Sequence, residues 1–229
     1  MNLSLVLMAT IIETSASPQA LLMLLALMSP AFPTGGFAYS HGLERAIDDG
    51  VVKTADDVYH WIEALLKHGS GWNDAVIFAC AHRANENELL SLDALALALA
   101  ASKERAMETA DLGQSFSKAA ATLSSGAPSH FKTYPLVVAV ACRNAGIPFA
   151  QSLSGFMQAF SNNLISVAVR LVPLGQTQGL NVMRQLMPII IEICDKAARA
   201  TPDDLGSSTL QADIASMQHE TQYSRVFRT

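Results

Sequence analysis

Histidines are the side chains of this sequence best suited to bind a metal or transfer a proton, and they are scattered along the chain. The six are His41, His60, His68, His82, His130 and His219. No pair stands four residues apart beside a glutamate, so the H-E-x-x-H zinc motif is absent. His60 and His68 are about two helical turns apart, too far to share one ion on a straight helix. His219 and Glu220 could bind nickel or zinc weakly, but isolated histidines more often have surface or core roles, which we expect here.

Nucleophiles and paired acids show no catalytic arrangement either. The G-x-S-x-G motif of serine hydrolases does not occur. Cys80, Cys142 and Cys194 are far apart and lack C-x-x-C spacing, which indicates free core thiols in a reducing cytoplasm. Glu44 and Asp48 share one face of an expected helix, where neighbouring charges favour a solvated acidic ridge. We therefore predict no catalytic residue, no metal ligand and no cofactor, so the chain is not expected to be an enzyme.

The stretch 29–50 is the densest in turn-forming residues. Two prolines and the pair Gly35–Gly36 fall within seven positions, which predicts a constrained turn between two helices. A helix pattern resumes at Phe37. A glycine turn that opens a helix can hold an anion, but no strand precedes this one, and neither the G-x-x-x-x-G-K-[ST] nor the G-x-G-x-x-G motif is present. We expect a tight helix–helix corner in which Gly36 has a positive φ or allows two backbones to approach closely.

Three motifs in order along the chain resemble the UreF family of urease accessory proteins. They are SPAFPTGGFAYSHGLE (29–44), NNLISVAVRLVPLGQTQG (162–179) and ADIASMQHETQYSRVFR (212–228). The first is similar to the family signature Ser-Pro-x-x-Pro-x-Gly-Gly-(Phe/Tyr)-x-x-Ser-x-Gly-(Leu/Met)-Glu. The matching residues are Ser29, Pro30, Pro33, Gly35, Gly36, Phe37, Ser40, Gly42, Leu43 and Glu44. Thr34 departs from the valine that is frequent in the family, and the first 17 residues lie outside the similarity.

The resemblance implies a function that the residues alone do not give. UreF proteins are non-enzymatic, all-helical chaperones that bind UreD (UreH in some species) and the GTPase UreG during nickel loading of apo-urease. The resemblance also implies a homodimer and a role in modulating GTP hydrolysis by UreG. We expect a structural turn and partner surface that comprises Pro33, Gly35, Gly36, Phe37, Tyr39, Ser40 and Glu44. Two alternatives from the residues stay open, an all-helical adaptor and a metal-dependent hydrolase of unknown substrate.

Composition agrees with a protein whose surface is partly covered by other proteins. Of the 229 residues, 50% are hydrophobic and only 15% are charged, well below the usual share of about 25%. The net charge of −5 comes without a dense basic patch, so nucleic acid is not an expected partner. The apolar N-terminal run of ten residues is too short to span a bilayer, so no membrane insertion is expected. We expect a cytoplasmic protein.

Helical periodicity recurs throughout, and no hairpin signal appears. The sequence predicts an all-α fold, a single compact bundle of about nine or ten helices with a mobile N-terminal arm and C-terminal tail. We divide the chain into the arm (1–17), an all-helical domain (18–201) and a linker, last helix and tail (202–229). Helices are expected at about 18–28, 37–49, 54–68, 72–85, 91–101, 103–123, 135–145, 148–169, 177–200 and 208–218.

The C-terminal tail combines apolar and cationic side chains in a way that favours an interface. Tyr223, Arg225 and Phe227 are of the types enriched where proteins meet. A flexible linker at 202–208 would let the tail order on binding. We therefore predict that the tail binds a partner, UreD above all, with Arg225 and Phe227 as anchors. The alternative is that the tail folds back on its own core.

Overall fold

Helices make up all of the regular secondary structure in the computed structural model, which describes residues 17–123 and 130–229. These ranges hold ten α-helices and two short 3-10 helices, so the predicted all-α fold and helix number are confirmed. The expected N-terminal arm lies, apart from Ser17, outside the described residues. The α-helices are α2 Pro18–Leu27, α3 Leu43–Asp48, α4 Ala55–His68, α5 Ser70–Arg83, α6 Glu86–Ala98, α7 Lys103–Ala120, α8 Tyr134–Asn144, α9 Phe149–Leu171, α10 Gln176–Ala197 and α11 Leu210–His219. The 3-10 helices are η1 Gly36–Ala38 and η2 Pro202–Asp204.

Local capping interactions decide where α4 and α6 begin. The Thr54 hydroxyl accepts a hydrogen bond from the Asp57 amide at 3.2 Å, and the Asp57 carboxylate accepts one from the Thr54 amide at 2.9 Å. Asn85 and Glu88 form the same reciprocal pair. Such capping boxes satisfy amides that have no partner inside the helix. The α4 start agrees with the sequence, but Ser91, the predicted start of α6, lies inside that helix because Asn85 caps it earlier.

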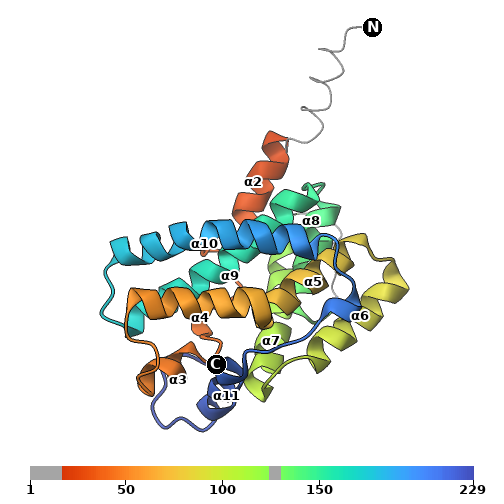
Figure 1. Ribbon diagram of the computed structural model, residues 1–229. Helices are drawn as coiled ribbons and strands as arrows, with labels where there is room; N and C mark the ends of the chain where they lie inside the picture. The colour runs from red at the N-terminus through yellow and green to blue at the C-terminus, as the bar shows by residue number, and fades with distance from the viewer. Residues whose placement is uncertain (1–16, 124–129) are drawn as a thin grey trace, which may run out of the picture.

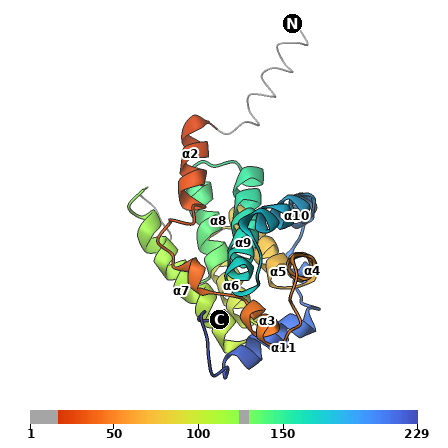
Figure 2. The same ribbon diagram turned by 90° about the vertical axis from the view of Figure 1, so that its left-hand side faces the viewer.

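The bundle is built around α5 and α9, which the other long helices cover. In Figure 1, α10, α9 and α4 run side by side, and α10 packs against both α9 and α4. On the other side, α8 lies between α5 and α7. Phe78 and Phe156, both buried, bring α5 and α9 together with their ring centres 5.2 Å apart. Figure 2 shows α2 at one end, extending away from the bundle, and α3, α11 and the C-terminus gathered at the other.

The glycine-rich turn differs from the expected continuous helix at 37–49. One 3-10 turn, η1, is followed by the extended residue Tyr39 and then by the short helix α3. His41 and Gly42 separate them with left-handed backbones, at φ 55° and φ 76°. An L-residue cannot continue a right-handed helix through that conformation, which explains the break. The left-handed member of the glycine pair is Gly35, at φ 78°, and the expectation for Gly36 is wrong in this respect.

The C-terminal part of the chain is packed on the bundle. Trp72 donates its indole N–H to the Asp204 carbonyl at 2.8 Å, and the Gly206 amide donates to Asn73 Oδ1 at 2.9 Å. The segment 202–208 is therefore held against α5 and is not the flexible linker expected from its composition. The tail, expected to be mobile, also lies against the bundle, with Phe227 only 4% exposed.

Replacing Gly42 with alanine should destabilise the protein strongly. The new Cβ would lie 2.7 Å from the Ser216 amide nitrogen of α11, and the residue would have to keep a positive φ. We expect a loss of about 2–4 kcal/mol in the free energy of unfolding, measured by chemical denaturation. The matched control is Gly35→Ala, at the same φ but with open space around the Cβ, which should cost about 1 kcal/mol. Equal losses at the two positions would contradict the close approach of α11 to the turn.

Candidate functional site

A group of charged side chains is buried where α3, α7, α11 and the tail meet. Its central members are His41, Glu44, Glu104, Glu108 and His219, and each is less than a tenth exposed. Glu108 and His219 are almost completely enclosed, at 1% and 0%. A buried charge is strongly unfavourable unless other charges and hydrogen bonds compensate it. We call these five residues, together with Arg105 and Asp74, the buried charge cluster.

His219 joins the two carboxylates at one end of the cluster. Its Nδ1 lies 2.8 Å from Glu104 Oε2, and its Nε2 lies 3.1 Å from Glu44 Oε2. Glu44 comes from α3 and Glu104 from α7, so the last residue of α11 connects three helices that are far apart in sequence. The sequence left weak metal binding open for His219 but favoured a surface or core role, and in the structure both ring nitrogens contact carboxylates in the interior.

Glu44 and Glu104 also hold the C-terminal tail. The two oxygens of Glu44 accept hydrogen bonds from the backbone amides of Val226 and Phe227, at 2.7 and 2.8 Å. Glu104 Oε1 accepts one from the Arg225 guanidinium at 2.8 Å. Glu44 is therefore not part of a solvated acidic ridge, and this expectation is wrong. Its partners lie more than 170 residues further along the chain, beyond the reach of local spacing rules.

At the other end of the cluster, Glu108 pairs with Arg105 and His41. Its carboxylate lies 2.8 Å from His41 Nε2 and also contacts the Arg105 guanidinium. Burial works to raise the pKa of Glu108, but Arg105 and His41 overcome it and hold that pKa at about 2. Burial, and then Arg105, lower the pKa of His41, so its imidazole is neutral at neutral pH. Burial raises the pKa of Asp74 to about 7, although Arg105 lies 4.0 Å away.

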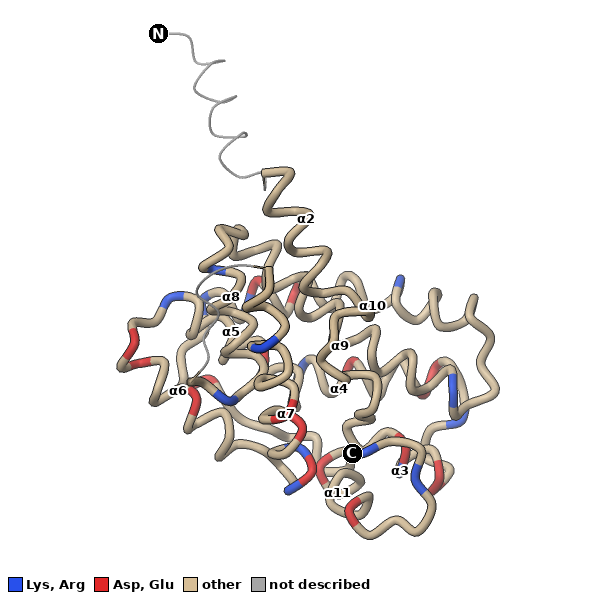
Figure 3. The backbone as a smooth tube through the Cα atoms, turned by 180° about the vertical axis from the view of Figure 1, so that it is seen from behind, with Lys and Arg blue, Asp and Glu red and all other residues tan. Residues whose placement is uncertain are grey.

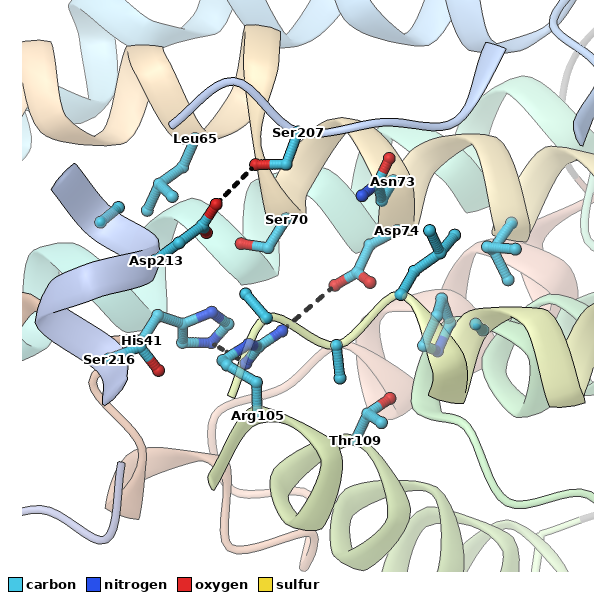
Figure 4. Close-up of a pocket in the computed structure, with 17 residues that line it drawn as sticks. His41, Leu65, Ser70, Asn73, Asp74, Arg105, Thr109, Ser207, Asp213 and Ser216 are labelled. Carbon is cyan, nitrogen blue, oxygen red and sulfur yellow. Dashed lines mark hydrogen bonds and ion pairs between the residues drawn. The ribbon is translucent and has the colours of Figure 1, made fainter. Parts of the chain in front are cut away.

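Two cavities border this end of the cluster, and both are lined by His41, Asp74 and Arg105. The smaller, about 50 Å³, lies beneath α11 and the 202–208 segment, and Figure 4 shows Arg105 pointing toward Asp74 across it. The larger, about 470 Å³, lies under the proline–glycine turn, with Phe32 and Phe37 in its wall. His41 Nδ1 is buried without a hydrogen-bond partner.

The structure separates the predicted turn residues into two groups. Tyr39 and Ser40 are buried beside the tail: the Ser40 amide donates to the Thr229 carbonyl at 2.7 Å, and the Tyr39 hydroxyl donates to Asp111 at 3.2 Å. They lie close to Glu44, so three of the predicted residues do come together. Gly36 and Phe37 instead line the larger cavity, where the Phe37 side chain is 64% exposed, and Pro33 is also exposed.

The predicted tail anchors are also divided. Phe227 is buried, and the Arg170 guanidinium lies over its ring, 5.8 Å from the ring centre. Arg225 is paired with Glu104. Both contacts are within the chain and correspond to the fold-back alternative. Tyr223 is fully exposed and has no such contact with the core. Neither predicted anchor is therefore exposed in full, and among the three predicted tail residues Tyr223 is the one open to contact with another protein.

Sequence reasoning missed Glu104, Arg105 and Glu108, although a signal was present. Along α7 the buried positions Leu112, Phe116 and Ala120 recur every four residues. Extending that spacing backwards gives Glu108 and Glu104, so the apolar stripe of the helix continues into two acids. A carboxylate in line with a core stripe indicates a buried, paired charge.

Within residues 17–123 and 130–229, no group of three or more His, Cys, Asp or Glu side chains is placed to hold a metal ion. The metal-dependent hydrolase alternative therefore gains no support from this part of the chain. In the same ranges, no helix combines the length and apolar character needed to cross a bilayer.

Comparison with known proteins places the chain among urease accessory proteins. The UreF family profile matches residues 52–187. The urease accessory protein UreF of Mesorhizobium japonicum is 44% identical over 215 residues, covering 92% of this chain and 96% of the relative. The UreF proteins of Rhizobium leguminosarum bv. viciae and Roseobacter denitrificans are 45% and 42% identical, covering 92% and 93% of this chain and 97% and 96% of the relatives.

The raised pKa of Asp74 predicts a pH-dependent effect of the substitution Asp74→Asn. Between the ordinary value of 3.8 and about 7, the folded protein keeps a proton on Asp74 that the unfolded chain has lost. Stability from this group therefore falls as the pH rises through that window, and asparagine, which resembles the protonated acid, escapes the loss. We expect Asp74→Asn to stabilise the protein more at pH 8 than at pH 5, by about 2–3 kcal/mol in urea denaturation, because two pH units of the window remain above pH 5.

The control is Asp56→Asn, at an aspartate that is 82% exposed on α4. Its effect on the free energy of unfolding should not differ between the two pH values. A gain for Asp74→Asn that is the same at pH 5 and pH 8 would show that burial does not keep this carboxyl protonated.

Proposed function

The chain belongs to the UreF family of urease accessory proteins, and from this membership we propose that it is a non-catalytic scaffold for nickel insertion into urease. In this proposal it binds UreD (UreH in some species) and the GTPase UreG in the cytoplasm and presents them to apo-urease. Nickel is the cargo of the assembly, and GTP hydrolysis by UreG is modulated through contact with this chain.

Exposed apolar surface is the observation that carries the scaffold proposal. Large apolar side chains stand outside the core on three helices, where they form stripes of the kind that protein partners cover. These side chains are Leu21, Leu22 and Leu25 on α2, Leu180, Met187 and Ile191 on α10, and Leu210, Ile214 and Met217 on α11. Figure 3 shows in addition that α2 carries no Lys, Arg, Asp or Glu. A helix with exposed leucines and no charged side chain is more stable when a partner covers it.

The α11 stripe is the surface we assign to UreD. Leu210 and Ile214 border a groove of about 440 Å³, together with Val51 and Trp61. The tail begins where α11 ends, so the exposed side chain of Tyr223 lies only four residues beyond His219. An amphipathic helix with an aromatic side chain near its end fits the apolar core and aromatic content of protein interfaces. UreG and a second copy of the chain would then use other surfaces, such as α2 and α10.

Reconstitution of urease activation is the direct test of the proposed function. Apo-urease, UreD, UreG, nickel and GTP should yield active enzyme at a substantially higher rate with this chain than without it. Size-exclusion chromatography with light scattering should show two copies of the chain in the complex with UreD. Equal activation without the chain, or turnover of a substrate by the purified chain alone, would overturn the scaffold proposal.

Two substitutions in the tail separate its partner role from its structural role. Tyr223→Ala should weaken UreD binding by about 2 kcal/mol, roughly 30-fold, and leave the melting temperature unchanged, because this side chain is exposed. Phe227→Ala, at a buried position, should instead lower the free energy of unfolding by about 3 kcal/mol. Binding is measured by calorimetry. Unaltered affinity in Tyr223→Ala would remove the tail from the proposed interface.

A further inference from the structure

The contacts of His219 require more protons than its neutral ring carries. Each of its ring nitrogens lies within hydrogen-bond distance of a carboxylate oxygen, one on Glu44 and one on Glu104. An ionised carboxylate only accepts hydrogen bonds, and a neutral imidazole has a single N–H. Both contacts are satisfied only if two protons are shared among the three groups. Loss of one proton leaves a ring lone pair facing a carboxylate at a buried position, which is repulsive.

The same two carboxylates are the main attachment points of the tail. Glu44 receives the Val226 and Phe227 amides, and Glu104 receives Arg225. Two protons shared between His219 and the two acids would compensate the negative charges that otherwise lie side by side there. Without the second proton, the mutual repulsion of the acids acts on the groups that hold the tail in place.

We propose that residues 220–229 form a proton-controlled strap, closed over the buried charge cluster while His219, Glu44 and Glu104 share two protons and opened when one is lost. Closure covers Phe227 and brings the Thr229 carbonyl onto Ser40. Opening exposes an apolar side chain and uncovers the turn that carries Tyr39 and Ser40. The strap thus couples the pH around the protein to the accessibility of this end of the bundle.

The other charged groups around His219 do not account for the same response. Burial works to lower the pKa of Arg105, but Glu108 and Asp74 raise it above its ordinary value, so Arg105 stays cationic. Glu108, next to Thr229, stays ionised because its pKa is about 2. Glu220 and Asp213, on or beside α11, receive hydrogen bonds from the Lys103 amide and the Ser207 hydroxyl and do not contact the ring.

Three other sites with titratable groups lie near the strap or the cluster: the Arg228–Asp111 pair, Asp74 and His41. Arg228 lies 3.9 Å from Asp111, on the exposed side of the strap. Asp74 titrates near pH 7, but it belongs to the far end of the cluster, beyond Arg105, as does the neutral His41. The substitution Asp74→Asn therefore removes the titration of Asp74 and leaves the contacts of His219 in place.

Hydrogen exchange measures the opening of the strap directly. Protection of the Val226 and Phe227 amides, corrected for the intrinsic exchange rate at each pH, should be constant at low pH and then fall about tenfold per pH unit once the cluster releases its proton. Amides in the centre of α9 should keep their protection. The Asp74→Asn protein should show the same fall as the wild type.

The variant Glu104→Gln tests whether the second shared proton controls the strap. A glutamine amide can donate to Nδ1 of a neutral His219 and still accept from Arg225, so the strap should stay closed up to pH 9. The matched control is His60→Gln, because His60 also lies between two carboxylates, Asp56 and Glu63, but on the exposed face of α4. That protein should open as the wild type does. Constant wild-type protection from pH 6 to 9, or an identical fall in Glu104→Gln, would overturn the proposal.

A measurement on the wild type avoids dependence on the folding of a variant. The nitrogen NMR shifts of the His219 ring and the carboxyl carbon shifts of Glu44 and Glu104 should together account for two protons at each pH where the strap amides are protected, and for one where protection is lost. A single proton on the three groups, found together with full protection of Val226 and Phe227, would equally overturn the proposal.

Discussion

The burial of two glutamates on the core-facing stripe of α7 is the constraint on which the end of the bundle depends. Glu104 and Glu108 stand in line with Leu112 and Phe116, so α7 cannot pack its apolar residues without enclosing the acids as well. An enclosed carboxylate without partners costs several kcal/mol. Arg105, His41, His219 and Arg225 are the groups that remove this cost, and they come from four segments. The turn, α11 and the tail therefore all lie where they compensate the buried charges of Glu104 and Glu108.

The sequence predicted the fold better than the site, for a physical reason. Caps and apolar periodicity act over a few residues, so α4 and the all-α class followed from local patterns. The burial of Glu44 is decided by His219 and Phe227, more than 170 residues away, and no spacing rule reaches that far. The tail was judged by composition alone, which does not distinguish an aromatic side chain that packs inside, such as Phe227, from one that stays outside, such as Tyr223.

The residues of the buried charge cluster come partly from the range that the UreF profile matches and partly from the segments on either side of it. The UreF profile covers residues 52–187, which include Asp74, Arg105 and Glu108 but neither the proline–glycine turn nor the tail. The relatives align over more than nine-tenths of the chain. The central helices provide Glu104, Arg105 and Glu108, whereas His41, Glu44, His219 and Arg225 come from the two flanking segments.

The pairing of Glu44 with residues 219–227 has a consequence for how the chain reaches its native state on the ribosome. These contacts join an early segment to a late one, and closing so long a loop is slow and entropically unfavourable. While the chain is being made, α3 and α7 exist for many seconds before their partners are synthesised. During that interval Glu44 and Glu104 must remain hydrated, so this end of the nascent bundle stays open to water. Hydration of these two carboxylates therefore delays the packing of this end of the bundle until α11 has emerged.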